Sequence, residues 1–261
     1  VFNSSAVAYY CGNRGVLTLD ESDNPKDKTL MDRLARIIQA RRYLKYGIPM
    51  KNKTRVVAHR GFWHTDGSAQ NSIASLLKAD QLGVYGVEFD VWMASDGVPV
   101  LNHDGWHDGY EVQSPPSTVL TTLKLENGEL MPTLAQYLEA AKDTKVHLVL
   151  ELKPHATPEA ETAAAEAVVK MVGRYGLSKR VTYISFSLHI MKELARLAPA
   201  KTQLMYLGGG TLPKDLKAMG LTGCDFNYGV YLNNPTWLND IKALKMASNV
   251  WTVNNPADMM W

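Results

Sequence analysis

The chain has 261 residues but only two cysteines, Cys11 and Cys224. Two distant thiols make neither a disulfide framework nor a paired metal motif. No apolar run approaches the roughly 18 residues that a membrane helix needs, so we expect no transmembrane segment. The net charge is only +2, and no basic patch is interleaved with aromatic residues. We therefore expect no nucleic-acid partner.

Several catalytic motifs are also absent from the sequence. There is no Gly-x-Ser-x-Gly elbow, which argues against a serine hydrolase of the α/β type. There is no His-Glu-x-x-His, which argues against a zinc protease of that class. There is no Gly-x-Gly-x-x-Gly turn, so a dinucleotide-binding, doubly wound sheet is not favoured.

Residues 1–53 read as an N-terminal extension. Residues 1–28 are polar and irregular, whereas 29–45 carry apolar residues near one stripe and arginines largely off it. That spacing predicts one amphipathic helix over 29–45. We expect it to pack on the main domain; the alternative is a helix that meets a membrane surface or a partner.

From residue 54 onward, short apolar strands alternate with longer helical segments. This pattern predicts βαβ units around a parallel sheet, and with no nucleotide-binding turn it favours a closed TIM-type (β/α)8 barrel over 54–261. The expected strands are 55–59, 86–91, 99–102, 146–152, 181–186, 203–207, 223–227 and 248–253. The expected helices are 71–82, 133–142, 158–175, 188–197, 212–219 and 235–245.

One expected strand, 99–102, does not fit the alternation. It follows 86–91 with no helix between, and Asp96-Gly97 reads as a tight turn, so the pair is interpreted as a local excursion. Only seven βα units then remain, and the barrel lacks its last strand in this chain. We expect either that the native protein continues beyond Trp261 or that 99–102 takes part in closing the barrel.

Three carboxylates lie near the ends of apolar strands. Glu88 and Asp90 are two residues apart, which places them on one face of a strand, and Glu151 follows another apolar run. Buried carboxylates need a cation. A set of carboxylates without cysteine suits Mg²⁺ or Ca²⁺ better than zinc. The alternative is a salt-bridge network with Arg60 and Lys153.

Two histidines also end apolar runs. His59 and His103, beside a carboxylate cluster, suit a general acid and a general base near neutral pH. Arg60 offers a planar fork that matches phosphate oxygens, and Gly61 permits a sharp turn. His64 and His107 are weaker candidates, in loops that could overhang the site.

The ordered set of motifs resembles the glycerophosphodiester phosphodiesterase family. The resemblance spans about 54–261 and rests on these stretches: "AHRG" (58–61), "QNS" (70–72), "EFDV" (88–91), "DGVPVLNHD" (96–104), "ELKP" (151–154), "SFS" (185–187) and "WTVN" (251–254). It implies a TIM-type barrel of the phospholipase-C-like phosphodiesterase type, with 105–132 as a small insertion at its mouth. It also implies metal-dependent hydrolysis of a small glycerophosphodiester to glycerol 3-phosphate and an alcohol.

The resemblance further implies roles for individual residues. His59 and His103 would be the acid and base; Glu88, Asp90 and Glu151 would bind one divalent cation, Mg²⁺ or Ca²⁺; Arg60 and Lys153 would contact phosphate; Trp251, with Trp63 or Trp106, would flank the glycerol, and Asn71 is a further substrate-site candidate. The family usually has Glu where Gln70 stands, so no metal role is carried to Gln70. It also has a further strand after "WTVN", which this chain lacks.

Two other functions remain open at this point. One is a phospholipase D-like phosphodiesterase acting on lysophospholipids, although 105–132 is mostly polar. The other is a non-catalytic barrel that binds phosphodiesters. The family includes exported and cytosolic members, and the chain begins at Val1 without a visible signal peptide. A start without Met is compatible with a trimmed leader, and we expect a periplasmic or otherwise exported protein, with the cytoplasm as the alternative. Neither the metal nor the oligomeric state follows from the sequence.

Overall fold

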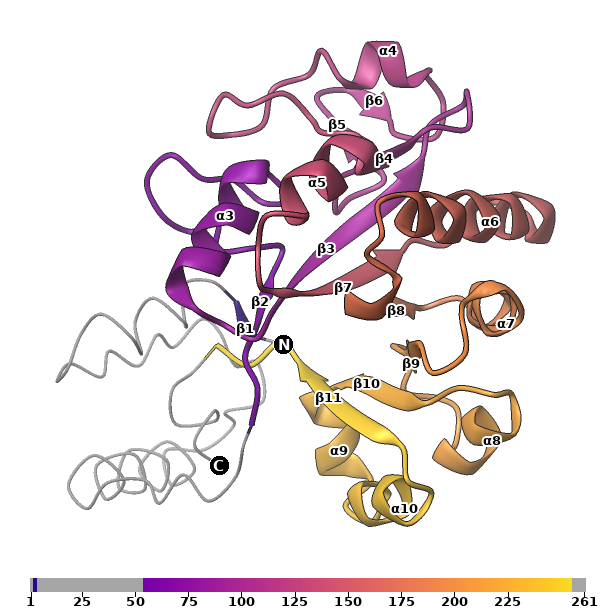
Figure 1. The fold of residues 1–261 in the computed structure, drawn as a ribbon. Coiled ribbons are helices and arrows are strands. Elements are labelled where there is room, and N and C mark those ends of the chain that lie inside the picture. Colours follow the sequence, from indigo (N-terminus) through magenta and orange to yellow (C-terminus); the bar gives the residue numbers. More distant parts are fainter. Residues whose placement is uncertain (1, 4–53, 255–261) are drawn as a thin grey trace, which may run out of the picture.

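A computed structural model of the chain describes residues 2–3 and 54–254. Its parallel strands curl into part of a barrel, with helices on the outside (Figure 1). The strand order is β1-β2-β3-β7-β8-β9-β10-β11, and all neighbours along this path are parallel. This arrangement confirms the expected TIM-type barrel and its incompleteness: the seven predicted βα strands are present, and within the described residues no pairing joins β11 back to β1 or β2.

The strands fall close to the predicted ranges. They are β2 (Val57–His59), β3 (Gly86–Met93), β4 (Pro99–Leu101), β7 (His147–Leu152), β8 (Val181–Ser185), β9 (Gln203–Tyr206), β10 (Gly223–Asn227) and β11 (Ala247–Trp251). One further strand, β1 (Phe2–Asn3), pairs with β2, although the sequence reads as irregular there. The predicted helix over 29–45 lies outside the described residues.

The helices begin and end where the sequence places capping residues. They are α3 (Ile73–Leu82), α5 (Leu134–Ala141), α6 (Pro158–Arg174), α7 (Leu188–Leu197), α8 (Pro213–Ala218), α9 (Tyr228–Asn233) and α10 (Trp237–Ala243). Thr157 accepts a hydrogen bond from the amide of Ala160 at the start of α6, and Gly83 adopts the left-handed conformation after α3. Both are recognisable helix-end signals. Of these helices only α9 was not predicted. None of the helices in the described residues has the length and apolar character that crossing a membrane requires.

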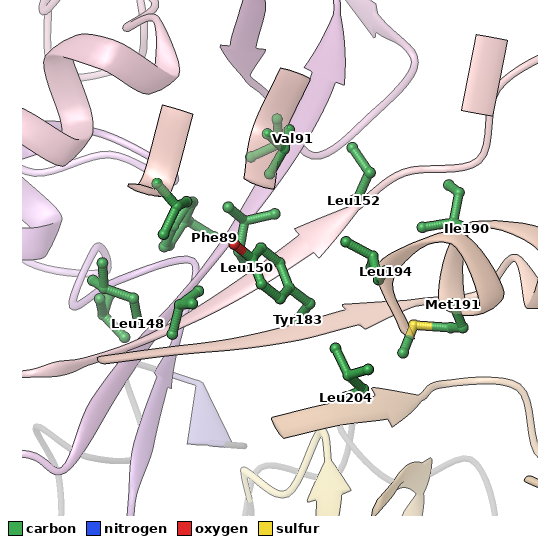
Figure 2. Packing of buried hydrophobic residues seen from close by; sticks show 14 of the residues in the cluster. Phe89, Val91, Leu148, Leu150, Leu152, Tyr183, Ile190, Met191, Leu194 and Leu204 are labelled. Atoms are coloured by element: carbon green, nitrogen blue, oxygen red, sulfur yellow. The ribbon is translucent and has the colours of Figure 1, made fainter. Parts of the chain in front are cut away.

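Alternation along the strands separates an outer core from the barrel interior. Phe89 and Val91 of β3 and Leu150 of β7 point outward, where α7 covers neighbouring strands with Ile190 and Leu194 (Figure 2). The period of two then turns the residues between them toward the interior. Apolar packing on the outer face thus fixes the register that directs Glu88, Asp90 and Glu151 inward.

The segment after β3 is an antiparallel excursion, as the Asp96-Gly97 turn predicts. β4 returns along β3 with Leu101 opposite Val91, and it lies off the barrel path. The alternative in which 99–102 closes the barrel is therefore wrong. The chain continues through β5 (Trp106–His107), β6 (Tyr110–Glu111) and α4 (Ser117–Leu120). Val112 and Leu120 of this segment pack with Ala94 and Val100 in a small second apolar cluster.

Candidate functional site

Three buried carboxylates form the centre of the candidate site. Glu88 and Asp90 come from β3 and Glu151 from the neighbouring β7, where Asp90 and Glu151 are register partners. One oxygen of each residue lies within 4.8 Å of the others. All three side chains are buried, with residue exposures of 2%, 0% and 7%. The sequence prediction that these residues meet on one face is confirmed by this geometry.

Lys153 compensates part of the negative charge. Its Nζ lies 2.8 Å from both Asp90 Oδ1 and Glu151 Oε1. Burial opposes a charge on Lys153, but the two carboxylates outweigh it and raise its pKa. The guanidinium of Arg60 is the second cation, with Nε 4.0 Å from Asp90 Oδ2. Three carboxylates thus face two permanent cations, and the fully ionised cluster carries one excess negative charge.

The pKa values of the three carboxyls diverge accordingly. Burial and the neighbouring Asp90 and Glu151 raise the pKa of Glu88 well above its ordinary range. Burial and Asp90 raise the pKa of Glu151 to about 7. The pKa of Asp90 is lowered, because Lys153 and other partners outweigh its burial. Asp90 is therefore the carboxyl group that ionises most readily in the cluster, and Glu88 and Glu151 are the two whose ionisation is opposed.

This donor set fits a divalent metal ion. Glu88 Oε1 is buried and has no hydrogen-bond partner among the described residues, which is costly unless a cation or a ligand satisfies it. Carboxylate oxygens are the ligands that hard cations prefer. The cluster could therefore hold a metal ion, which would also remove the excess negative charge.

A strained turn places Arg60 at the rim of this cluster. Arg60 and Gly61 both have positive φ, 57° and 81°, which is rare for a residue with a side chain. A Cβ on Gly61 would lie 2.1 Å from Ser75 Oγ, so only glycine fits. The Arg60 amide donates to Glu88 Oε2 at 2.8 Å, and its guanidinium donates to Gln70 Oε1. Arg60 thus contacts Glu88 of the carboxylate cluster through its backbone and Gln70, outside the cluster, through its side chain.

His59 and His103 lie on the same cavity from different strands. His59 ends β2, with Nε2 3.8 Å from Glu88 Oε2, and burial followed by Arg60 lowers its pKa to about 3. His103 follows β4, and its Nδ1 lies 2.8 Å from the exposed carboxylate of Asp104. Burial also lowers the pKa of His103. Burial therefore disfavours the protonated form of both imidazoles, and only His103 has a carboxylate at hydrogen-bond distance that opposes this effect.

The cavity measures about 150 Å³ and has two chemically different sides. Its polar side carries His59, Arg60, Glu88, His103, Glu151 and Lys153. Its other side is formed by Ile184, Phe186, Leu207, Asp225, Trp251 and Thr252. The predicted Trp251 does line the cavity, and Phe186 packs against it edge-to-face, with ring centroids 5.6 Å apart. Trp63 and Trp106 do not line it, and Trp106 is 63% exposed.

Other predicted residues lie beside the cavity. Asn71 is buried and holds Asp90 from both directions: its Nδ2 donates to Asp90 Oδ2 at 2.9 Å, and its Oδ1 accepts from the Asp90 amide at 3.0 Å. His107 contacts the carbonyl of Lys124 instead, and neither it nor His64 lines the cavity. The sequence reasoning missed Phe186 and Asp225. A lone carboxylate inside the apolar strand "GCDFN" was the available signal for Asp225.

The ordered motifs and this geometry agree with the comparison to protein families. Residues 59–261 match the model of the glycerophosphoryl diester phosphodiesterase family. The chain belongs to this family. Its catalytic class is therefore that of a phosphodiester hydrolase, as the sequence predicts, and the two alternatives to glycerophosphodiester hydrolysis are not favoured.

Individual family members match most of the barrel. A glycerophosphodiester phosphodiesterase from Caldanaerobacter subterraneus is 28% identical over 226 residues, which is 79% of this chain and 88% of the relative. The crystal structure of one from Parabacteroides distasonis has a TM-score of 0.78 and 48% identity, covering 80% of this chain and 90% of that one. A phosphodiesterase from Oleispira antarctica, in complex with the product sn-glycerol-3-phosphate, has a TM-score of 0.67 and 25% identity, covering 77% and 85%.

Proposed function

We propose that this chain hydrolyses small glycerophosphodiesters to glycerol 3-phosphate and an alcohol at the cavity between Glu88 and Trp251. The observation that carries the proposal is the convergence of three buried carboxylates, two fixed cations and two histidines at one cavity, which all of them except Asp90 line. The Oleispira relative holds sn-glycerol-3-phosphate, and the present site offers the chemistry to bind the same product.

Glu88, Asp90 and Glu151 would hold one Mg²⁺ or Ca²⁺ ion. When bound, such an ion supplies positive charge beside the phosphate, where attack increases the negative charge. Arg60 and Lys153 add fixed donors at the same place. Asn71 does not contact substrate in this proposal; it positions Asp90 through its two hydrogen bonds.

The histidines divide the proton transfers between them. Asp104 orients the imidazole of His103 and stabilises its protonated form, so we assign the His103 imidazolium as the general acid, which gives its proton to the departing alcohol and becomes neutral. His59 has no such partner and lies beside Arg60, so it remains neutral and takes the proton from the attacking water. The bond from phosphorus to the water oxygen forms, and the bond to the alcohol oxygen breaks.

The apolar side of the cavity limits the size of the substrate. Pockets for drug-sized ligands measure roughly 300–1,000 Å³, so a cavity of about 150 Å³ suits one glycerol phosphate unit. The rings of Phe186 and Trp251 would flank the carbon atoms of the glycerol. The glycerol phosphate unit, and not a lysophospholipid chain, is therefore the part of the substrate that is enclosed.

The activity is tested with His59→Ala and His103→Ala, assayed on glycerophosphocholine with Mg²⁺ or Ca²⁺. General acid–base groups contribute about 10²–10⁴-fold, so each variant should lose at least a hundredfold in kcat. His189→Ala is the control. His189 lies at the start of α7, where it contacts Thr162 of α6, and it does not line the cavity. Activity near wild type in both site variants would refute the proposal.

The assignment of acid and base is tested with a second substrate, a glycerophosphodiester whose alcohol is an acidic phenol. A phenolate leaves without being protonated, so this substrate should restore His103→Ala much more than His59→Ala. Restoration of His59→Ala alone would reverse the assignment of acid and base, and equal restoration of both variants would remove it. Neither result would affect the proposed hydrolysis.

A further inference from the structure

A fourth carboxyl group lines the same cavity, outside the metal-type cluster. Asp225 lies in the middle of β10 and is fully buried. Its neighbours Cys224 and Phe226 belong to the outer core. Its register partner Asn249 lies between Ala247 and Trp251, which pack on the interior cluster. Asp225 therefore faces the barrel interior, as its place on the cavity wall also indicates.

The hydrogen bonds of Asp225 are incomplete. Oδ2 accepts from the Asn249 side chain at 3.1 Å, but Oδ1 is buried without a hydrogen-bond partner among the described residues. Whereas Asp90 has Lys153 and Asn71, the Asp225 carboxyl has a single amide partner among the described residues. Burial raises its pKa to about 6. A buried acceptor in a ligand cavity without a partner is most simply explained by a donor on the ligand.

The surroundings of Asp225 restrict what that donor can be. The Trp251 indole donates to the backbone carbonyl oxygen of Asp225 at 2.8 Å. The backbone of Asp225 therefore holds the aromatic ring in place beside the Asp225 carboxyl group. An anionic phosphate is repelled by Asp225 and attracted by Arg60 and Lys153. A ligand that spans the cavity therefore presents phosphate to the cations, carbon atoms to Trp251 and Phe186, and a neutral donor to Asp225. A glycerol phosphate unit has this order of groups.

We propose that the Asp225 carboxylate accepts a hydrogen bond from a hydroxyl of the substrate's glycerol and is a specificity-determining residue for that half of the substrate. This inference rests on the proposed function. A site built to pair with a hydroxyl discriminates strongly against an analogue that lacks it, because the buried acceptor is then left unsatisfied. The variable alcohol of the substrate extends away from Asp225, so its identity has little influence on this residue.

The test measures kcat/KM for wild type, Asp225→Ala and Asp225→Asn on two substrates. One is glycerophosphocholine; the other is a matched diester in which the glycerol lacks its 2-hydroxyl or its terminal hydroxyl. The wild type should prefer the full glycerol by about 10- to 150-fold, the range for a hydrogen bond to a charged group. Asp225→Ala should lose that preference by slowing on the full substrate while remaining within threefold on at least one deoxy substrate. Exposed Asp240→Asn should behave as wild type.

Each other outcome overturns the inference. An equal loss on all substrates would make Asp225 a structural residue, and no loss would remove it from the substrate site. A loss seen with a choline or ethanolamine alcohol but not with a glycerol alcohol would mean that Asp225 binds the ammonium group instead. If Asp225→Ala does not fold, Asp225→Asn carries the comparison with a smaller expected loss of preference, since it keeps the volume of the side chain and replaces a charged acceptor by a neutral one. Absence of hydrolysis by the wild type would refute the proposed function and is distinguishable from all of these.

Discussion

Replacing Glu151 by glutamine should stabilise the metal-free protein at pH 8. In the folded chain the pKa of Glu151 is raised from 4.5 to about 7 by burial and by Asp90. A difference of about 2.5 in pKa corresponds to about 3 kcal/mol, which is the cost of keeping this side chain ionised at high pH. Glutamine has nearly the same shape and no charge. We expect a gain of about 1–3 kcal/mol, or roughly 2–4 °C per kcal/mol in Tm for a chain of this size.

The sign follows from linkage. A carboxyl whose pKa is raised on folding favours the folded state most when it is protonated. For Glu151 this contribution to the free energy of unfolding is fully present below the unfolded pKa of 4.5, and it is lost as the pH rises through the folded pKa of about 7. The difference between Glu151→Gln and wild type should therefore be small at pH 5 and large at pH 8. The same substitution at Glu161, a buried glutamate outside the cluster that accepts from Ser187 and the His155 amide, is the matched control.

Glu151→Gln should also reduce the stabilisation that the protein gains from a bound divalent cation. A cation present at 100 times its Kd stabilises a protein by about 2.7 kcal/mol, so wild type should gain several degrees in Tm with Ca²⁺ or Mg²⁺. Glu151→Gln should lose most of that gain, because one of three ligands is neutral. Differential scanning fluorimetry with EDTA and with each cation measures both effects. A variant that is less stable than wild type in EDTA at pH 8, or that responds fully to the cation, would refute the reasoning.

Three further predictions concern residues around the site and the fold. Gly61→Ala should cost at least about 3 kcal/mol of unfolding free energy in urea, whereas Gly83→Ala, with a similar φ but open space, should cost only about 1–2; equal costs would exclude the clash with Ser75. Gln70→Glu should raise KM several-fold at saturating cation, because a carboxylate would offset the Arg60 charge that the amide leaves intact; an unchanged KM would contradict this. His147→Gln should flatten the rise of stability with pH between about 4 and 6.5, by at most about 1.4 kcal/mol per pH unit, because burial, Arg180 and Arg55 lower the pKa of His147 to about 4; an unchanged slope in urea titrations would show that this imidazole does not contribute.

The parts of the site that follow strand periodicity could be predicted from the sequence. Glu88 and Asp90 interrupt an apolar run at every second position, and Glu151 and Lys153 do the same. A buried face was therefore distinguishable before any coordinates were known. The β3–β4 turn was recognisable from Asp96-Gly97 for the same kind of local reason.

Other features depend on contacts that no local pattern records. The sequence makes Asn71 a candidate for the substrate site, but its hydrogen bond to Asp90, nineteen positions away in the chain, could not be predicted from any local pattern. Phe186 and Trp251 meet only because β8 and β11 curl toward one cavity, and the sequence suggested Trp63 or Trp106 in place of Phe186. Pairing of β1 with β2 joins segments more than fifty residues apart, and propensity says nothing about which distant strand is the neighbour.

The hairpin of β3 and β4 has an evolutionary consequence. It carries Glu88 and Asp90 on one strand and His103 just beyond the other, and the Trp92 indole donates to the His103 carbonyl across it. The insertion 105–132 emerges directly after this braced histidine and packs with Ala94 and Val100 of the hairpin in one apolar cluster. Its Glu129 also accepts from the Ile73 and Ala74 amides at the start of α3. Changes in the insertion are therefore constrained by the hairpin that carries Glu88 and Asp90, and we expect the insertion and the site to vary together during evolution.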